Sequence, residues 1–300
     1  MSILVVGTVA IDSIETPTEA RDHVLGGSAT HFSDAARFFA PVRLVGVVGD
    51  DFPQQHVSLL RERQIDLEGL QVVKGGKTFY WKGKYHANMN DRDTLEVHLN
   101  VFGDFDPHVP ENFRRSPLVF LANGSPMVQS KVLEQVVGPK LVVADTMDLW
   151  IRETRDELLD LLKKIDGVVM NDSEAKLLTQ EENLVRAGQR VRELGPKFVI
   201  IKKGEHGAMF FSEHETYVMP AFPTEQVVDP TGAGDSFAGG IMGYLAEQDN
   251  FNPTTLKRAL AYGVLVASFT VEDFSLERLR RIQRSDIDLR MEQYQKMLSF

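Results

Sequence analysis

The sequence predicts an α/β fold built on a doubly wound, mostly parallel sheet with helices on both faces. Short apolar segments alternate with segments of helical periodicity from residue 118 onward, as is typical of parallel sheets covered by helices. The expected strands of this part lie at 118–121, 141–144, 167–170 and 198–201. A length of 300 residues with 43% hydrophobic composition suits one large domain, which we expect to span residues 1–300.

The composition excludes several classes of function. A formal net charge of −10 argues against general affinity for nucleic acid or anionic membranes, because both attract basic patches. The absence of cysteine excludes disulfides and thiolate metal sites, and no histidine pair has the His-Glu-x-x-His spacing. No apolar run approaches the ~18 residues of a membrane span, and the N-terminus lacks the pattern of a signal peptide. We therefore expect a cytoplasmic protein without general affinity for nucleic acid or membranes.

The N-terminal segment predicts a buried strand that ends in a carboxylate. The β-branched run 3–6 leads through Gly7 to Asp12. A lone aspartate at such a place is typical of a turn or a cap, and it is also a candidate ligand. Residues 13–25 are polar, contain a proline and show no clear period, so we expect a loop there.

A glycine pair, Gly26 and Gly27, directly precedes a segment with apolar residues at helical spacing. Glycines at this place let a ligand approach the backbone closely. His31 lies in the first turns of this helix, where a histidine is most often a structural hydrogen-bonding residue.

The next segments predict one strand-helix unit, followed by a region of different composition. Residues 42–48 form an apolar strand, Asp50 and Asp51 are typical capping residues, and a helix is expected from Pro53 towards Gln64. Residues 69–99 mix aromatic, β-branched and charged residues around a turn-like centre. We expect strands that lie outside the central sheet.

Polar residues follow three of the expected parallel strands, namely Asn123, Asp145 and Asn171. Ligands of doubly wound folds bind beyond the carboxyl ends of strands, so these residues are site candidates. Asp145 is also a typical helix cap. Asn171 and Glu174 have the spacing of a capping box, in which each side chain bonds the other residue's backbone. The same residue can cap a helix and belong to a ligand site.

The segment Asp229 to Gly240 carries the strongest chemical signal of the chain. Gly232-Ala233-Gly234 forms a turn ahead of a helix that carries apolar residues on one side. Amides at a helix N-terminus lack intrahelical acceptors and the macrodipole is positive there, so this turn suits an anion. Asp235 gains nothing as a ligand of a phosphate, because like charges repel, but it can accept a proton from an attacking hydroxyl.

The glycine segments resemble other known motifs only in part. Asp235 could simply complement the dipole of a capped helix. A dinucleotide fingerprint would need glycine where Phe237 stands, and no P-loop spacing occurs. Residues 26–30 miss the nucleophile elbow at the last position.

Towards the C-terminus the sequence predicts two more helices. Residues 256–274 are mostly apolar, and we expect their helix to end near Glu272 and Asp273. Residues 278–300 are amphipathic and charged, which indicates a solvated helical tail.

The run Asp229 to Phe237 resembles the C-terminal signature of the ribokinase/PfkB carbohydrate kinase family. Gly26-Gly27 resembles the N-terminal signature, with His31 where many relatives carry asparagine, and Asn171 with Glu174 resembles the Asn-x-x-Glu motif. The resemblance implies a ribokinase-like fold. It also implies a small β lid from about 13–25 and 70–100, which in many relatives forms a homodimer contact.

The resemblance further implies roles for individual residues. Asp235 would be the catalytic base and Gly232, Ala233 and Gly234 the anion hole. The implied acceptor-binding residues are Asp12, Gly26, Gly27, His31 and Asn123. The implied nucleotide-binding residues are Asn171, Glu174, Lys202, Lys203, Gly204 and Gly207. The last four match the family's nucleotide turn only in the glycines.

Implied cofactors are ATP, Mg²⁺ and K⁺. Glu174 would hold Mg²⁺ through water, and Asp229 and Thr231 match the positions that hold a monovalent cation. We therefore expect an ATP-dependent kinase that phosphorylates a hydroxyl of a sugar or sugar-like substrate. A nucleoside kinase is the nearest alternative, since the same architecture accepts ribose carrying a base. A non-catalytic nucleotide-binding regulator is a third, against which the presence of Asp235 argues.

Overall fold

The structure, a computed structural model, describes residues 1–299. Most strands belong to one large sheet, which is parallel from β11 to β5 and antiparallel at β12 and β13. Its order is β13 (Thr216–Met219), β12 (Ala208–Ser212), β11 (Phe198–Lys202), β10 (Gly167–Asn171), β9 (Leu141–Asp145), β8 (Leu118–Leu121), β1 (Ile3–Val6), β4 (Val42–Gly49) and β5 (Ile65–Val73). This confirms the expected doubly wound, mostly parallel sheet.

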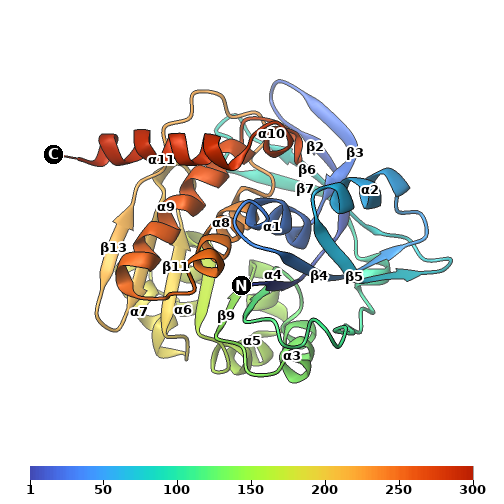
Figure 1. The fold of residues 1–300 in the computed structure, drawn as a ribbon, viewed down its shortest axis with the longest axis horizontal. Coiled ribbons are helices and arrows are strands. Elements are labelled where there is room, and N and C mark those ends of the chain that lie inside the picture. Colours follow the sequence, from blue (N-terminus) through green and yellow to red (C-terminus); the bar gives the residue numbers. More distant parts are fainter. Residues whose placement is uncertain (300) are drawn as a thin grey trace.

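Both faces of the large sheet are buried, as the side chains of β1 show. Ile3 and Val5 point into one apolar cluster, and Leu4 and Val6 point into a second cluster on the opposite face. The first cluster is covered by α1 (Ser28–Ala36), α2 (Gln54–Glu62), α8 (Ala233–Gln248), α9 (Pro253–Thr270), α10 (Glu277–Arg280) and α11 (Arg284–Leu298). The second is covered by α3 (Pro126–Gln135), α4 (Asp148–Glu153), α5 (Arg155–Leu162), α6 (Asp172–Thr179) and α7 (Leu184–Glu193). Figure 1 shows α1, α8 and α9 packed together, with α3 and α5 below.

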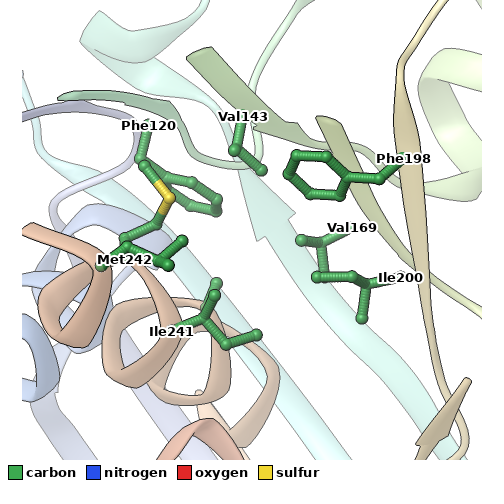
Figure 2. A pocket seen from close by; sticks show the side chains of 9 residues that line it. Phe120, Val143, Val169, Phe198, Ile200, Ile241 and Met242 are labelled. Carbon is green, nitrogen blue, oxygen red and sulfur yellow. The ribbon is translucent and has the colours of Figure 1, made fainter. Parts of the chain in front are cut away.

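The packing of α8 against the sheet is tight. Figure 2 shows Ile241 and Met242 of α8 facing Phe120, Val143 and Val169 of the sheet. The space between these side chains admits no water molecule. Such close packing fixes the start of α8 relative to the carboxyl ends of the strands.

The strand order reverses between β1 and β8. From β1 the chain proceeds to β4 and β5 on one side, and β8 to β11 extend on the other. Such a reversal opens a crevice at the carboxyl ends of the strands, which is where ligands bind in folds of this type. Asp12 and Asn123 follow the two strands at this point.

A second sheet, here called the small sheet, stands apart from the large one, at the upper right of Figure 1. Its order is β3 (Ala20–Gly26), β2 (Ala10–Glu15), β6 (Phe79–Tyr85) and β7 (Arg92–His98). Two short 3₁₀ helices complete the secondary structure, η1 (Asn100–Phe102) and η2 (Gly204–His206).

The expected loop over 13–25 was wrong, because most of this segment lies in β2 and β3. The first four residues of β3 are exposed. An edge strand that is solvated in this way needs no apolar alternation, so the sequence carried no strand signal. The expected single strand through Gly7 is likewise divided into β1 and β2, which belong to different sheets. Residues 69–73 were expected outside the central sheet, but they belong to β5, which is the edge strand of the large sheet.

The C-terminal helices differ from expectation in two ways. Helix α9 ends at Thr270 rather than near Glu272. The tail is packed rather than solvated, since α11 buries Ile287, Met291 and Tyr294 on one side. Phe300 lies outside the described residues. None of the helices within residues 1–299 combines the length and the apolar composition needed to cross a bilayer.

Candidate active site

The start of α8 forms the predicted anion turn. Gly232 precedes the first turn with a φ of 74°, a left-handed conformation that glycine adopts without strain. A Cβ at this position would also overlap with the ring of His31. The turn therefore requires glycine for two reasons, and it presents the first amides of α8 next to Asp235.

Asp235 lies in the first turn of α8, where its surroundings favour the neutral carboxyl. Burial raises the pKa of Asp235 to about 7, and the charge of Asp145 acts in the same direction. Lys202 and Arg92 oppose this rise. A pKa close to neutrality suits a group that takes up a proton in one step and releases it afterwards.

Lys202 and Asp145 form a buried ion pair beside the anion turn. Lys202 Nζ donates to Asp145 Oδ2 over 2.9 Å, and the side chains are 20% and 4% exposed. Although burial disfavours its charge, Asp145 and Glu174 raise the pKa of Lys202. A Cβ on Gly234 would lie only 3.2 Å from Lys202 Nζ, so the ammonium group adjoins the turn. Asp145, whose role the sequence left open, thus holds the charge of Lys202 at this place.

Asn171 and Glu174 form the capping box that their spacing indicated. Asn171 N–H donates to Glu174 Oε2 over 2.6 Å, and Glu174 N–H donates to Asn171 Oδ1 over 2.8 Å. The Asn171 amide also donates to Glu174 Oε1 over 2.7 Å. Burial raises the pKa of Glu174 to about 7, Lys202 lowers it, and Asp145 raises it. The carboxylate therefore belongs to the same charged group as Lys202 and Asp145.

Asp12 lies against the glycine pair at the start of α1. It is 4% exposed, and a Cβ on Gly26 would overlap with its carboxyl group. Burial raises the pKa of Asp12 to about 8, the charges of Asp229 and Asp235 add to this, and a hydrogen bond from the Gly27 backbone opposes it. Asp12 therefore borders the start of α1, the helix whose His31 adjoins Gly232 of the anion turn.

His31 is buried against the anion turn. It is 2% exposed, and its Nδ1 has no hydrogen-bond partner among the described residues. Burial lowers the pKa of His31 to about 4, against the charge of Asp34. The ring is therefore neutral near pH 7 and adjoins Gly232. Its predicted contact with the acceptor stays a prediction.

Asn123 has local partners. Trp150 Nε1 donates to Asn123 Oδ1 over 2.9 Å, and the Asn123 amide donates to Met147 Sδ over 3.2 Å. The hydroxyl of Ser28 donates to its backbone carbonyl over 3.2 Å. These contacts place Asn123 next to the start of α1, but they occupy its side chain. Its predicted role in acceptor binding stays a prediction.

Asp229 and Thr231 lie where the small sheet meets the large domain. Thr231 N–H donates to Asp229 Oδ1 over 2.9 Å, and Ser275 N–H donates to Oδ2 over 3.4 Å. Burial raises the pKa of Asp229 to about 6, and these hydrogen bonds oppose the rise. The hydroxyl of Thr231 donates to the hydroxyl oxygen of Tyr85 over 3.1 Å, so the small sheet is bonded to the signature segment.

The turn around η2 has a second contact with the small sheet. Gly204 and Gly207 both have positive φ values, and the Lys203 amide donates to the Gly207 carbonyl over 2.7 Å. The Asn90 amide, in the β6–β7 turn, donates to Glu205 Oε1 over 3.2 Å. The small sheet therefore extends over the predicted nucleotide turn as well as the signature segment.

Sequence reasoning missed the contributions of Tyr85, Asn90 and Arg92. All three belong to the small sheet or its turn, and they act on residues far away in the chain. Where both faces of a strand carry aromatic and charged residues, the sequence does not show which face each residue occupies, so it contained no signal for these contacts.

A cavity of about 430 Å³ lies on the opposite face of the small sheet. Ile11, Tyr80 and His98 line it, and residues of the adjoining loops complete it. Ile11 and Tyr80 alternate with Asp12 and Trp81, so their side chains point away from the Asp12 face. The cavity is therefore separate from the predicted catalytic residues.

Several known proteins resemble this chain over most of its length. Residues 134–278 match a family described as pfkB family carbohydrate kinase. The cytidine kinase of Thermococcus kodakarensis is 30% identical over 249 residues, which cover 81% of this chain and 87% of that protein. The nucleoside kinase of Methanocaldococcus jannaschii is 28% identical over 268 residues, covering 87% and 82%.

Among solved structures, a putative ribokinase II from E. coli in complex with ATP and Mg²⁺ has a TM-score of 0.80 at 22% identity. It covers 97% of this chain and 99% of its own. This likeness confirms the ribokinase-like fold. Because the relation to the cytidine kinase extends over most of both chains, this chain belongs to the PfkB family of carbohydrate kinases and is an ATP-dependent kinase.

Proposed function

We propose that this kinase phosphorylates a hydroxyl of a nucleoside. The observation that carries the proposal is the 30% identity to a cytidine kinase over 87% of that protein. The site agrees with it, because the carboxyl group of Asp12 has two oxygens that suit the vicinal diol of a ribose. Of the two acceptor classes that the sequence left open, the sugar and the nucleoside, the second has the stronger support.

In the proposed reaction Asp235 accepts the proton of the acceptor hydroxyl. The hydroxyl oxygen forms a bond to the γ-phosphorus of ATP, and the bond from that phosphorus to the β,γ-bridging oxygen breaks to leave ADP. The amides of Gly232 to Gly234 stabilise the negative charge that moves between these oxygens. Asp12 orients the acceptor, and the neutral ring of His31, which adjoins Gly232, is a further proposed acceptor contact.

The nucleotide side would be formed by the charged group around Lys202. Its ammonium adjoins Gly234, so it can contact a phosphate in the anion turn. Lys203, Gly204 and Gly207 lie at the next turn and are proposed nucleotide contacts. Among residues 1–299 no group of three acidic or histidine side chains could hold a metal alone. This fits Mg²⁺, which is usually bound by one or two carboxylates together with substrate phosphates and water.

Glu174, oriented by Asn171, is the proposed Mg²⁺ residue, acting through water. A bound Mg²⁺ would neutralise charge on the β- and γ-phosphates. The sequence predictions of a cytoplasmic location and of a homodimer through the small sheet stay predictions, which cell fractionation and light scattering can test.

A monovalent cation site is proposed at Asp229 and Thr231. The carboxyl group of Asp229 is fully buried, and within residues 1–299 it accepts hydrogen bonds from the backbone amides of Thr231 and Ser275 but forms no ion pair. A cation there would stabilise the ionised form, because burial otherwise raises its pKa. We expect faster turnover in K⁺ than in tetramethylammonium at equal ionic strength. Equal rates in the two salts would exclude the K⁺ site, and Mg²⁺ dependence serves as the control.

The acceptor class is tested with a substrate panel. Cytidine, uridine, adenosine, inosine and guanosine are compared with ribose, fructose and a sugar acid, with ADP release and product mass as readouts. We expect kcat/KM for the best nucleoside to exceed that of the best bare sugar by about tenfold or more, equivalent to about 1.4 kcal/mol of additional binding in the transition state. A bare sugar that matches the best nucleoside would contradict the proposal.

A further inference from the structure

We propose that Trp81 is the stacking surface for the base of the acceptor, and that it sets the preference for nucleosides over bare sugars. The inference rests on the proposed function, which it makes more specific. Trp81 lies in the middle of β6 and is part exposed. Neither composition nor any motif of the sequence indicated a role for it.

Trp81 lies on the same face of the small sheet as Asp12. The two residues are direct register partners on the parallel strands β2 and β6. Side chains directly opposite on neighbouring strands point to the same face. Tyr85 lies on this face too, four residues along the strand, and its contact with Thr231 shows that the face is turned towards the signature segment.

The indole ring is held flat against its own sheet. A Cβ on Gly83 would overlap with the six-membered part of the ring, so the ring lies across this glycine. Trp81 Nε1 donates to the hydroxyl of Thr94 on the next strand over 3.2 Å. Trp81 also packs against the apolar cluster formed by Ile14, Tyr85 and Phe274. The ring is thus oriented before any ligand arrives, so little entropy of the Trp81 side chain would be lost on stacking. The guanidinium of Arg92 lies 6.0 Å from the centre of the ring and would have to move aside for a base.

The spacing of Asp12 and Trp81 fits a nucleoside. Neighbouring strands lie about 4.8 Å apart, a separation comparable to that between the centres of a ribose and its base. The ring itself lies across Gly83, whose partner on β2 is Ile14, so a ribose bound through its diol to Asp12 would direct its base diagonally across the two strands to reach the ring. Every base has a π face, and an indole is a large aromatic partner for it. A bare sugar has no group at this position and gains nothing from the ring.

The matched control is Tyr80. It is the adjacent aromatic residue of the same strand, but its side chain lines the cavity on the opposite face. Trp81→Ala, Trp81→Phe and Tyr80→Ala are compared with the parent for nucleoside, ribose and ATP. We expect Trp81→Ala to raise the nucleoside KM about 5- to 150-fold, the range expected for the loss of one stacked base. Its KM for ATP and its kcat/KM for ribose should not change, and Trp81→Phe should restore much of the loss.

A second measurement does not depend on turnover. The chain has two tryptophans, so binding of a nucleoside beside Trp81 should quench part of the protein fluorescence. The second tryptophan, Trp150, contacts Asn123 and can respond to the acceptor as well, so the variant Trp150→Phe is measured alongside. The quench of Trp150→Phe then comes from Trp81 alone; it should disappear when Trp81→Phe is added and persist when Tyr80→Ala is added. Thermal unfolding shows whether each variant is folded. If Trp81→Ala does not fold, the quench and the nucleoside KM of Trp81→Phe still test the proposal.

The outcomes separate the two proposals. A parent enzyme that phosphorylates no nucleoside would overturn the proposed function itself. The stacking role alone would be overturned if the parent phosphorylates nucleosides but substitution of Trp81 changes neither the nucleoside KM nor the fluorescence quench. Equal losses for nucleoside and ribose would show that Trp81 serves only to pack the small sheet, which also contradicts the inference.

Discussion

Asp235→Asn should lower kcat by about 10²–10⁴-fold, the usual contribution of a general base. The substitution keeps the size and hydrogen-bonding capacity of the side chain but removes the proton acceptor. ATP binding should persist, because the amides of Gly232 to Gly234 remain and the loss of a negative charge favours the phosphates. Single-turnover phosphorylation and nucleotide affinity measure the two effects separately, after circular dichroism has shown an unchanged fold.

The pH profile supplies the control for this variant. The base acts as a carboxylate, so kcat/KM of the parent should fall as the pH drops through about 7, the pKa to which burial raises Asp235. This limb should disappear in Asp235→Asn. If the limb persists, it belongs to another buried carboxyl group of the site, Glu174 with a pKa of about 7 or Asp12 with a pKa of about 8. A variant that keeps kcat within about threefold of the parent, far below the range for a lost base, would reduce Asp235 to a helix-capping residue.

Lys202→Met should destabilise the fold and the site together. The ammonium group is the partner of the buried Asp145, and it lowers the pKa of Glu174 and of Asp235. Removing one partner of a buried ion pair costs about 3–5 kcal/mol of the free energy of unfolding, because the remaining charge is uncompensated. The measurement is urea unfolding at several pH values, combined with the KM for ATP.

The sign of the pH dependence follows from the same charges. Burial raises the pKa values of Glu174 and Asp235 above those of the unfolded chain, and without Lys202 they rise further, so the ionisation of these two groups opposes folding. The loss of stability should therefore be largest at neutral and higher pH and should shrink as the pH falls and these groups bind protons. Lys203→Met is the matched control, since Lys203 forms no ion pair with any residue in 1–299. Equal destabilisation by both substitutions would contradict the role of the Lys202–Asp145 pair.

The double variant Lys202→Met with Asp145→Asn removes both charges of the pair. We expect it to recover part of the stability lost in Lys202→Met, because no buried carboxylate is then left without a partner. Additive losses would mean that the two residues act independently, against their 2.9 Å contact.

The sequence by itself determined the elements whose structure depends on neighbouring residues. The anion turn at Gly232 to Gly234, the glycine pair before α1 and the capping box of Asn171 and Glu174 are all formed within a few residues. Their amide geometry and caps follow from local backbone preferences, so their residue types were sufficient to indicate them. The parallel strands were recognisable for a similar reason, because burial on both faces requires continuous apolar runs.

Only the tertiary structure decided which distant residues meet. Lys202 and Asp145 are 57 residues apart, and Thr231 and Tyr85 are 146 residues apart. These contacts depend on strand order and register, and a shift of one residue would turn each side chain of the small sheet to the other face. The placement of Trp81 beside Asp12, rather than in the cavity with Tyr80, therefore follows from the pairing of β2 with β6, which no local pattern encodes.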